Sequence, residues 1–242
     1  MWGVLIALAA VAWATACSRL FRNPRHDPAY GLTITFARLY ARVFHQLRIS
    51  GLEHVPTDMH TGPLLIVANH TAGIDPILVQ SACPFHVRWM MANDMMLTSI
   101  DWFWKWVGVI SVNREGRDTT SVREAIRALQ GNEVVGIFPE GGLERPARQI
   151  RPFHPGVGLI IAKTKSPVLA VIIEGTPQIN PAWASLRVPS RSRITFKPMI
   201  WYEKKMGAAE IAADLRDRFH EWTGWAYNDT PPSPDQPDDS YV

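Results

Sequence analysis

Residues 67–79 read VANHTAGIDPILV. An apolar run stops at Asn69-His70, small residues follow, and Asp75-Pro76 opens a second apolar run. The first run is typical of a buried strand, and Asp-Pro is a common helix start because Asp caps free amides and Pro fits the first turn. The stretch therefore predicts a strand, a tight turn and a helix. Taken singly, Asp75 reads as a helix cap and His70 as a partly buried histidine.

The same alternation of strands and helices continues along the chain. Several expected strands are continuous apolar runs rich in Val and Ile, which is typical of strands that are covered on both faces. The pattern predicts an α/β domain with a mostly parallel central sheet flanked by helices. We expect strands at residues 47–55, 63–69, 85–92, 109–113, 133–139, 167–175 and 193–202, and helices at 75–82, 93–108, 121–132, 155–165 and 208–222. A Ser121 to Glu124 capping box is expected to begin the helix at 121–132.

Composition indicates one domain with small appendages. The chain has 242 residues, of which 47% are hydrophobic and 19% charged. Its two cysteines, Cys17 and Cys83, exclude a disulfide framework and a four-cysteine zinc site. Residues 228–242 carry four Asp and neither Lys nor Arg, so the net charge of +3 becomes 3 + 4 = +7 over residues 1–227. We expect a domain at 51–227 and a disordered acidic tail at 228–242.

The N-terminus predicts a membrane anchor. Residues 1–18 contain no charged side chain, and as a helix they would span about 27 Å against a hydrocarbon core of about 30 Å. Arg19, Arg22 and Arg25 follow directly, which by the positive-inside tendency keeps the remaining chain in the cytoplasm. We expect an uncleaved anchor at residues 1–20. A cleaved signal peptide is the alternative, weakened because no Lys or Arg precedes the apolar run.

Residues 21–50 predict a basic amphipathic helix that suits an interface with anionic lipids. An ordinary surface helix packed on the core remains the alternative. The apolar residues at helical spacing are Phe36, Leu39, Tyr40, Val43, Phe44 and Leu47, with Arg38, Arg42 and His45 off that stripe.

Polar clusters follow three of the expected strands. They are His70, Asn113-Arg114 and Glu140-Gly141-Gly142. Because the carboxyl ends of parallel strands meet at one edge of a sheet, where ligand sites collect, we expect these clusters to form one site.

His70 and Asp75 can act together if the turn between them brings their side chains into contact. Asp75 would then accept a proton from one ring nitrogen, and the other nitrogen would be free to take a proton from a hydroxyl. Such a base suits direct attack by a substrate alcohol on an activated acyl group. No G-x-S-x-G nucleophile elbow is present. Although His154, Glu140 and Asp75 could be gathered, no metal-binding pattern joins them, so we expect no metal.

The other clusters fit an anionic substrate. Arg114 is placed to pair with a phosphate, and Gly141 and Gly142 would let backbone amides approach an oxygen. Arg145, Arg148 and Arg151 add a basic rim. Solvated loops are the alternative reading of these arginines.

Four blocks of the sequence resemble the motifs of the glycerolipid acyltransferases, the lysophosphatidic acid acyltransferase group. They are Asn69-His70-x4-Asp75, Gly108 to Arg114, Phe138-Pro139-Glu140-Gly141 and Ser166 to Val171. The blocks run in the family's order across roughly residues 50 to 175. A His and an Asp at this spacing alone would be weak evidence, whereas four blocks in register make a specific match.

The resemblance implies transfer of a fatty acyl group from acyl-CoA or acyl-carrier protein to the free hydroxyl of 1-acyl-glycerol-3-phosphate, without metal or bound cofactor. On this analogy His70 is the general base and Asp75 orients it. Arg114 binds the acceptor's phosphate, and Glu140 and Gly141 help to form the acceptor site. We add Asn69, Asn113, Gly142 and Arg145 to the expected substrate-binding set.

Two departures from the family pattern keep the acceptor open. The third motif usually continues Thr-Arg-Ser, but here Gly142, Leu143 and Glu144 follow, so one expected cation is missing. Ala170 stands where the fourth motif usually has proline. Another lysolipid or hydroxylated lipid is therefore an alternative acceptor, and a thioester hydrolase with a His–Asp-activated water is a third hypothesis.

Overall fold

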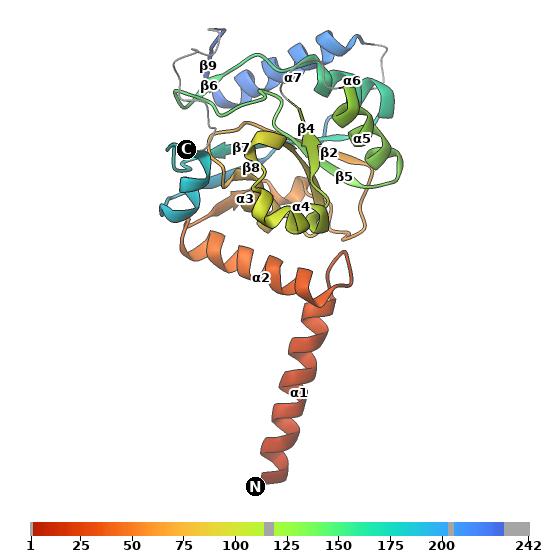
Figure 1. The fold of residues 1–242 in the computed structure, drawn as a ribbon, viewed down its shortest axis with the longest axis vertical. Helices are drawn as coiled ribbons and strands as arrows, with labels where there is room; N and C mark the ends of the chain where they lie inside the picture. Colours follow the sequence, from red (N-terminus) through yellow and green to blue (C-terminus); the bar gives the residue numbers. More distant parts are fainter. Residues whose placement is uncertain (1, 114–118, 203–205, 230–242) are drawn as a thin grey trace.

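The computed structural model describes residues 2–113, 119–202 and 206–229. They form a central sheet with helices on both faces, and α1 (Trp2–Phe21) extends away from this body while α2 (Pro28–Val43) lies across its base (Figure 1). Most of the expected acidic tail, residues 230–242, lies outside the described residues.

Seven strands form the main sheet, in the order β1-β8-β7-β2-β5-β3-β4. Every neighbouring pair is parallel except β7–β8, which is antiparallel. The prediction of an α/β domain with a mostly parallel central sheet is confirmed. The strands are β1 Arg48–Ser50, β2 Leu64–Ala68, β3 Val87–Ala92, β4 Ile110–Val112, β5 Val134–Ile137, β7 Val168–Glu174 and β8 Arg193–Phe196; β6 Gln149–Ile150 and β9 Ala226–Tyr227 form a separate pair.

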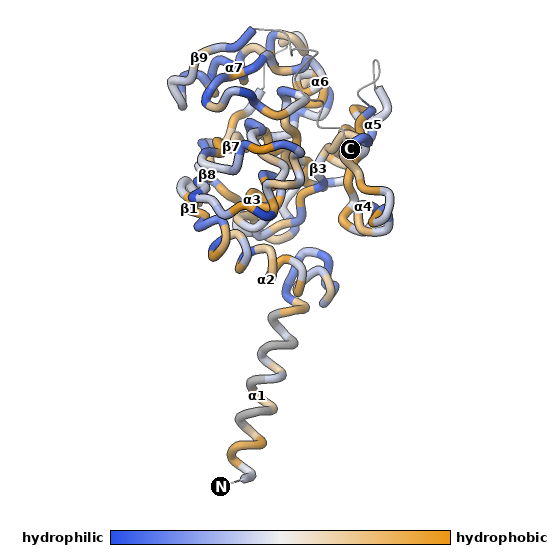
Figure 2. Tube along the Cα trace, turned by 60° about the vertical axis from the view of Figure 1, so that its left-hand side comes forward, coloured by the Kyte–Doolittle hydropathy of each residue, from blue (hydrophilic) through white to orange (hydrophobic). Residues whose placement is uncertain are grey.

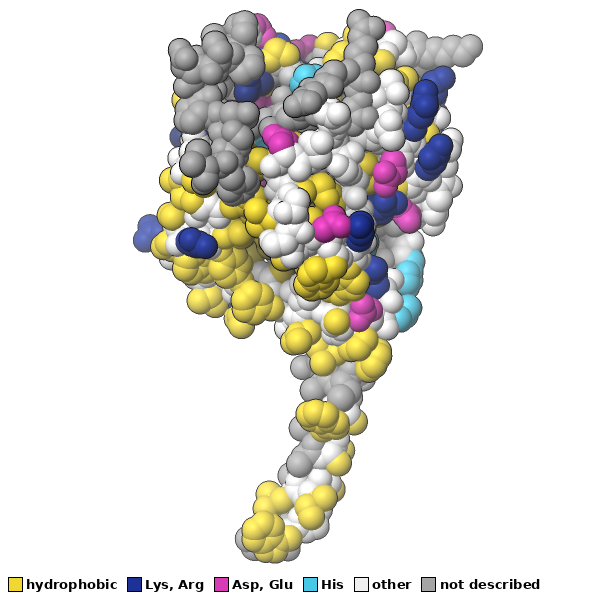
Figure 3. Space-filling model, in the orientation of Figure 1, with side chains coloured by type: hydrophobic (Ala, Val, Ile, Leu, Met, Phe, Trp, Pro, Cys, Tyr) yellow, Lys and Arg dark blue, Asp and Glu magenta, His cyan; other side chains and the backbone are white. Residues whose placement is uncertain are grey.

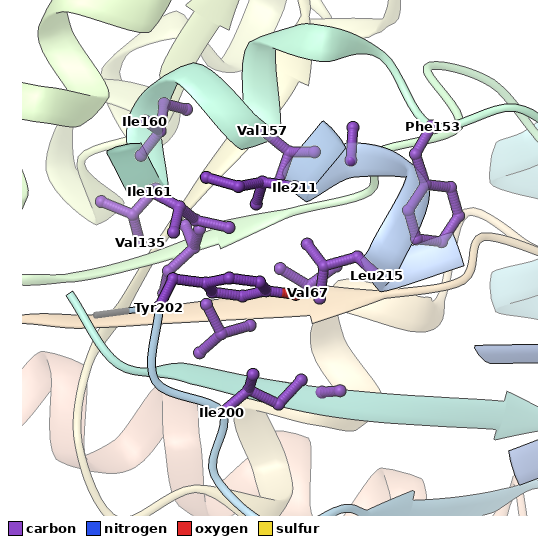
Figure 4. Packing of buried hydrophobic residues seen from close by; sticks show 14 of the residues in the cluster. Val67, Val135, Phe153, Val157, Ile160, Ile161, Ile200, Tyr202, Ile211 and Leu215 are labelled. Carbon is purple, nitrogen blue, oxygen red and sulfur yellow. The ribbon is translucent and has the colours of Figure 1, made fainter. Parts of the chain in front are cut away.

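Helices cover both faces of the sheet, and the alternation of side chains along β2 shows how. Leu65 and Val67 belong to a buried cluster with α5, α6 and α7, whereas Leu64 and Ile66 belong to one with α2 and α3. In Figure 4, Val67 lies among residues of α6 and α7. The remaining helices are α3 Asp75–Ala82, α4 Asp101–Val107, α5 Thr119–Gln130, α6 Pro155–Thr164 and α7 Ala208–Thr223.

Three predicted elements differ from the structure by more than a few residues. The expected strand at 47–55 ends at Ser50 because Gly51 has φ +73°, and the chain turns into a 3-10 turn, Leu52–His54. The expected strand at 193–202 ends at Phe196, with only a single bridge from Ile200 to Val168 beyond it. The expected helix at 93–108 is divided into 3-10 turns at Asn93–Met95 and Thr98–Ile100, followed by α4.

The predicted capping box at Ser121 is wrong. Helix α5 begins at Thr119, two residues earlier, and Ser121 is buried inside its first turn. The carboxylate of Glu124 instead pairs with Arg88 of β3 at 2.8 Å. An ion pair with a neighbouring element therefore replaces the local interaction that the spacing suggested.

The two N-terminal helices carry exposed apolar side chains. Leu32, Phe36, Leu39 and Val43 share one face of α2 and are each 60–67% exposed, and we call them the apolar stripe of α2. Hydrophobic residues recur along both helices in Figure 2. The opposite face of α2 packs on the domain, where Arg38 donates hydrogen bonds to the carbonyls of Ser81 and Cys83. The two interpretations of this segment, a surface helix and an interfacial helix, are thus compatible.

Within the part of the chain that the structure describes, none of the helices combines the length and apolarity needed to cross a membrane. The membrane anchor at residues 1–20 stays a prediction.

Candidate active site

His70 and Asp75 lie in direct contact at the carboxyl end of β2. Nδ1 of His70 is 3.0 Å from Oδ2 of Asp75, and the carboxylate is fully buried while the imidazole is 19% exposed. Because Oδ2 accepts, Nδ1 carries the proton and Nε2 keeps its lone pair. Among the described residues, Nε2 has no hydrogen-bond partner. The five-residue spacing therefore produces the geometry of a general base.

The side chain of Asp75 accepts several hydrogen bonds from residues that precede it and does not cap its own helix. Its Oδ2 also accepts from the backbone amides of Thr71 at 2.7 Å and Ala72 at 2.9 Å, and from Oγ1 of Thr71 at 3.4 Å. No side-chain hydrogen bond caps α3. The carboxylate thus bonds backward to the turn that follows β2, which fixes the turn and the imidazole together.

The imidazole of His70 is the top of a stack of three aromatic rings. Its centroid is 4.0 Å from that of Phe138, and Phe138 is 5.0 Å from Trp89, with interplanar angles of 16° and 13°. Gly136 makes room for the stack, since a Cβ there would lie 2.5 Å from the ring of Trp89. The stack restricts tilting of the imidazole, while Asp75 restricts its rotation.

The loop after β5 holds the backbone of His70 at both polar groups. The amide of His70 donates to Oε1 of Glu140 at 3.2 Å, and its carbonyl accepts from the amide of Glu144 at 2.6 Å. Oε1 of Glu144 in turn accepts from the amide of Gln149. The third sequence motif therefore positions the first.

Glu140 and Glu144 are buried carboxyl groups close to each other. Burial, reinforced by the neighbouring Glu144, raises the pKa of Glu140 well above its ordinary value. Burial also raises the pKa of Glu144 to about 7, opposed by hydrogen bonds from Gln149 and Asn69. The fold therefore favours the protonated form of Glu140, and Glu144 titrates near neutrality.

Asn69 faces the interior of the sheet. It is 2% exposed, and its amide donates to the carbonyl of Ile173 at 3.0 Å and accepts from the amide of Ile173 at 2.8 Å. These bonds tie the end of β2 to β7. The geometry of Asn69 thus fits positioning of the neighbouring His70 better than direct contact with a substrate.

The predicted cations and glycines have different surroundings. Arg145 donates to the carbonyl of Thr71 at 2.7 Å and to that of Glu144 at 2.8 Å, so one nitrogen braces the turn beside His70. Gly141 has φ +71°, and a Cβ there would lie 2.6 Å from His154, whereas Gly142 has space around it. Arg148 is exposed.

The second motif lies farther along the sheet. Asn113 follows β4 and is exposed, and β5 and β3 separate β4 from β2. Three strand spacings amount to about 14 Å. The predicted phosphate ligand Arg114 lies outside the described residues. The structure therefore brings His70, Asp75, Glu140 and Arg145 together, and leaves Asn113 at a distance from them.

Metal ligands do not gather at this site in the part of the chain that is described. There, no group of three or more His, Cys, Asp or Glu side chains could hold a metal ion.

Comparison with known proteins places the chain in a family. The family model described as Acyltransferase matches residues 46–174, just over half of the chain and all four motifs quoted above. The chain belongs to the acyltransferase family.

Curated relatives are similar to the middle part of the chain. It is 28% identical over 139 residues to a 1-acyl-sn-glycerol-3-phosphate acyltransferase of Borreliella burgdorferi, covering 53% of this chain and 51% of that one. A protein of the same description from Bacillus subtilis is 25% identical over 131 residues, covering 53% and 63%. A chloroplastic relative from Brassica napus is 26% identical over 151 residues, covering 60% and 43%. The matches span about half the length of these relatives.

A solved structure supports the fold. The 1-acyl-sn-glycerophosphate acyltransferase from Thermotoga maritima superposes with a TM-score of 0.62 over 88% of each chain, at 18% identity. At this identity the likeness shows that the two chains share a fold, and nothing finer.

Sequence reasoning missed two features of the site. Trp89 reads as an ordinary strand residue, because only the folded sheet brings it beside Phe138. Glu144 stands in the sequence as a departure from the third motif, whereas the structure makes it a direct support of His70. A Gly at 136 inside an apolar strand was the available signal for close packing at that point.

Proposed function

We propose that this protein is a membrane-associated O-acyltransferase that moves a fatty acyl group from an acyl thioester to the free hydroxyl of 1-acyl-glycerol-3-phosphate. The observation that carries the proposal is the contact between His70 and the buried Asp75, which leaves Nε2 of His70 free to accept a proton. The descriptions of the relatives supply the acceptor.

The proposed reaction needs one base and no covalent intermediate with the protein. Nε2 of His70 takes the hydroxyl proton as the acceptor oxygen attacks the thioester carbonyl carbon. The C–O bond forms, the C–S bond breaks, and the imidazolium returns its proton to the departing sulfur. Asp75 stabilises the imidazolium, and such acid–base catalysis contributes about 10²–10⁴-fold to the rate. The products are an ester and the free thiol of coenzyme A or of acyl-carrier protein.

The shortage of cationic side chains near His70 favours an acceptor without a terminal phosphate as an alternative. Leu143, where the family pattern has a cation, is apolar and only 8% exposed. Arg145, the nearest substitute, already donates two hydrogen bonds to backbone carbonyls. A lysolipid or hydroxylated lipid without a terminal phosphate is therefore the second candidate acceptor for the same mechanism.

Membrane association is supported by the exposed side chains at the base of the molecule. Figure 3 shows hydrophobic side chains along α1 and over the lower part of the body. Burying each large side chain of the apolar stripe of α2 in lipid is favourable by about 1.5–3 kcal/mol. An enzyme held in this way meets its lipid acceptor at the bilayer surface.

A matrix of donors and acceptors tests the proposal. Purified wild-type protein is assayed with acyl-CoA and with acyl-carrier protein against lysophosphatidate, other lysolipids and no acceptor. We expect acylation of lysophosphatidate that His70→Ala abolishes, with unchanged circular dichroism, while His54→Ala, a change at a partly exposed histidine in the 3-10 turn Leu52–His54, keeps activity. Dominant release of free fatty acid without an acceptor would make the protein a hydrolase, and full activity of His70→Ala would remove the base.

A further inference from the structure

A hollow lies at the edge of the sheet opposite to His70. Its volume is about 570 Å³, and its walls come from the α1–α2 connection, residues 59–61, the beginnings of β3 and β5, and α4. Because β2, β3 and β5 are parallel, this amino edge is separated from His70 by the length of β2, about 16 Å. A ligand bound in the hollow would therefore occupy a different site from the acceptor whose hydroxyl group meets His70.

Arg25 is the cation best prepared to meet a ligand in this hollow. Its guanidinium lies 5.5 Å from the ring of Tyr30 and 5.6 Å from that of Trp106, and it donates to the carbonyl of Trp106. Within the described residues it forms no ion pair with a carboxylate. The aromatic contacts fix the guanidinium in place, and its remaining N–H groups suit the oxygens of a phosphate.

Lys105 supplies a second cation that can turn toward a ligand. It pairs with Asp101 at 2.6 Å, but the two side chains are 77% and 52% exposed. Exposed pairs of this kind contribute little, so the ammonium can exchange its partner. Arg88, which also lines the hollow, is different, because Glu124 and Glu133 hold it at 2.8 Å and 2.7 Å as part of the wall.

The positive potential of these groups reaches into the hollow. Burial, helped by the guanidinium groups of Arg25 and then Arg88, lowers the pKa of His86 to about 4. His86 is therefore neutral at pH 7, and its ring is held by the hydroxyl of Tyr30 and the carbonyl of Val107. The lining of the hollow contains Arg25, Arg88 and Lys105 against one carboxylate, that of Glu133, and a concave surface with an excess of positive charge concentrates anions.

The hollow adjoins the surface that we assign to the membrane. Arg25 lies in the connection between α1 and α2, and both of these helices carry exposed apolar side chains. Figure 3 shows basic, histidine and acidic side chains gathered where α1 joins the body. Apolar contact below and cations above match the order of acyl chains and phosphates at a bilayer surface.

We propose that this hollow binds the phosphate group of an anionic membrane phospholipid, with Arg25 and Lys105 as its ligands, as a site separate from the catalytic one. The proposal rests on the membrane association proposed above. Binding there would set the depth and orientation of the domain on the bilayer, with no requirement that the bound lipid react.

Vesicle binding tests the site independently of activity. Wild-type protein is compared on phosphatidylcholine vesicles with and without phosphatidylglycerol, at one ionic strength. We expect a preference for the anionic vesicles that falls about fivefold in Arg25→Gln and about fivefold again in Arg25→Gln/Lys105→Gln. Arg193→Gln, which removes an exposed charge on β8 away from the hollow, should keep the preference.

The outcomes separate the two proposals. If wild-type protein binds both kinds of vesicle, and Arg25→Gln and Arg193→Gln lose the preference for anionic vesicles equally, the phosphate site is overturned while membrane association stands. Binding to neither vesicle would overturn membrane association and with it the headgroup assignment. Displacement of the protein by inorganic phosphate at constant ionic strength would assign the hollow to a small phosphorylated ligand instead of a headgroup.

Discussion

The carboxyl edge of the sheet and the base of the molecule organise their polar groups in opposite ways. Around His70, the carboxyl groups are buried and hydrogen bonded to a few backbone amides. At the base, Arg25 and Lys105 are exposed and lie beside an apolar surface. The difference teaches that the group proposed to react is held by buried hydrogen bonds, whereas the charged groups proposed to meet lipid stay in contact with solvent. The largest expected effect is therefore that of removing a buried, hydrogen-bonded carboxylate at the carboxyl edge.

Asp75→Asn is the strongest test of the fixed geometry. The oxygen of the amide can take the place of Oδ2 and keep the hydrogen bond from Nδ1 of His70, but the neutral side chain removes the negative charge that orients and stabilises the imidazolium. We expect kcat to fall about 10³–10⁴-fold with little change in KM. Steady-state kinetics with lysophosphatidate measures this, and Asp101→Asn, at an exposed carboxylate, is the control. A loss below about tenfold would mean that Asp75 does not orient the base.

Glu144→Gln tests the cost of a buried carboxyl group at the same edge. The folded-state pKa of Glu144 is about 7, against an ordinary value of 4.5. In the folded state Glu144 therefore keeps a proton that it loses in the unfolded chain. The contribution of protonated Glu144 to stability is fully present below pH 4.5 and is lost as the pH rises to about 7.

Glu144→Gln should remove this loss of stability between pH 4.5 and about 7, because the amide does not titrate. From pH 5 to pH 8, the free energy of unfolding of Glu144→Gln should rise relative to wild type by at most about 3 kcal/mol. Urea denaturation at both pH values measures the difference. Glu53→Gln, at an exposed site, should show no such change; a pH-independent difference for Glu144→Gln would contradict a neutral Glu144 in the fold.

Phe36→Glu tests whether the apolar stripe of α2, on the lower side of the molecule, binds lipid. A carboxylate in the middle of the apolar stripe of α2 removes burial of one ring and adds a charge that must stay in water. We expect vesicle affinity to fall by the equivalent of about 2 kcal/mol, roughly 30-fold, with unchanged thermal stability. Trp201→Glu, at a residue 61% exposed elsewhere on the domain, should bind as wild type does. Equal losses of vesicle affinity in Phe36→Glu and Trp201→Glu would show that α2 has no special role in membrane binding.

Phe138→Leu should have the smallest effect. An aromatic pair is worth about 0.5–1.5 kcal/mol beyond burial, so loss of the stack under His70 should lower kcat by up to about tenfold while KM stays constant. Phe138→Tyr should restore most of the rate. Phe153→Leu, which removes a buried ring from the other face of the sheet, should lower stability but not kcat. Equal kcat values for Phe138→Leu and wild type would leave the stack without a catalytic role.

The sequence predicted well those features that depend on neighbouring residues. Alternating apolar runs gave the layers of the fold, and the spacing of His70 and Asp75 anticipated their contact, because a five-residue turn is a local structure. Helix α5 was placed with the wrong start, since the long-range pair between Glu124 and Arg88 overrides the local capping pattern. The stack of Trp89, Phe138 and His70 was not predictable, because it joins three strands whose order only the folded sheet defines.

The hydrogen bonds from the loop after β5 to the backbone of His70 have a consequence for engineering. The same loop carries Gly141, Gly142 and Arg145, the residues expected to face the acceptor, together with Glu140 and Glu144, which hold the histidine. Grafting this segment from a relative to change acceptor preference would therefore also shift the reacting nitrogen. For the proposed activity, acceptor selectivity and turnover would therefore change together, and designs should vary Gly142 first, where a new side chain has room.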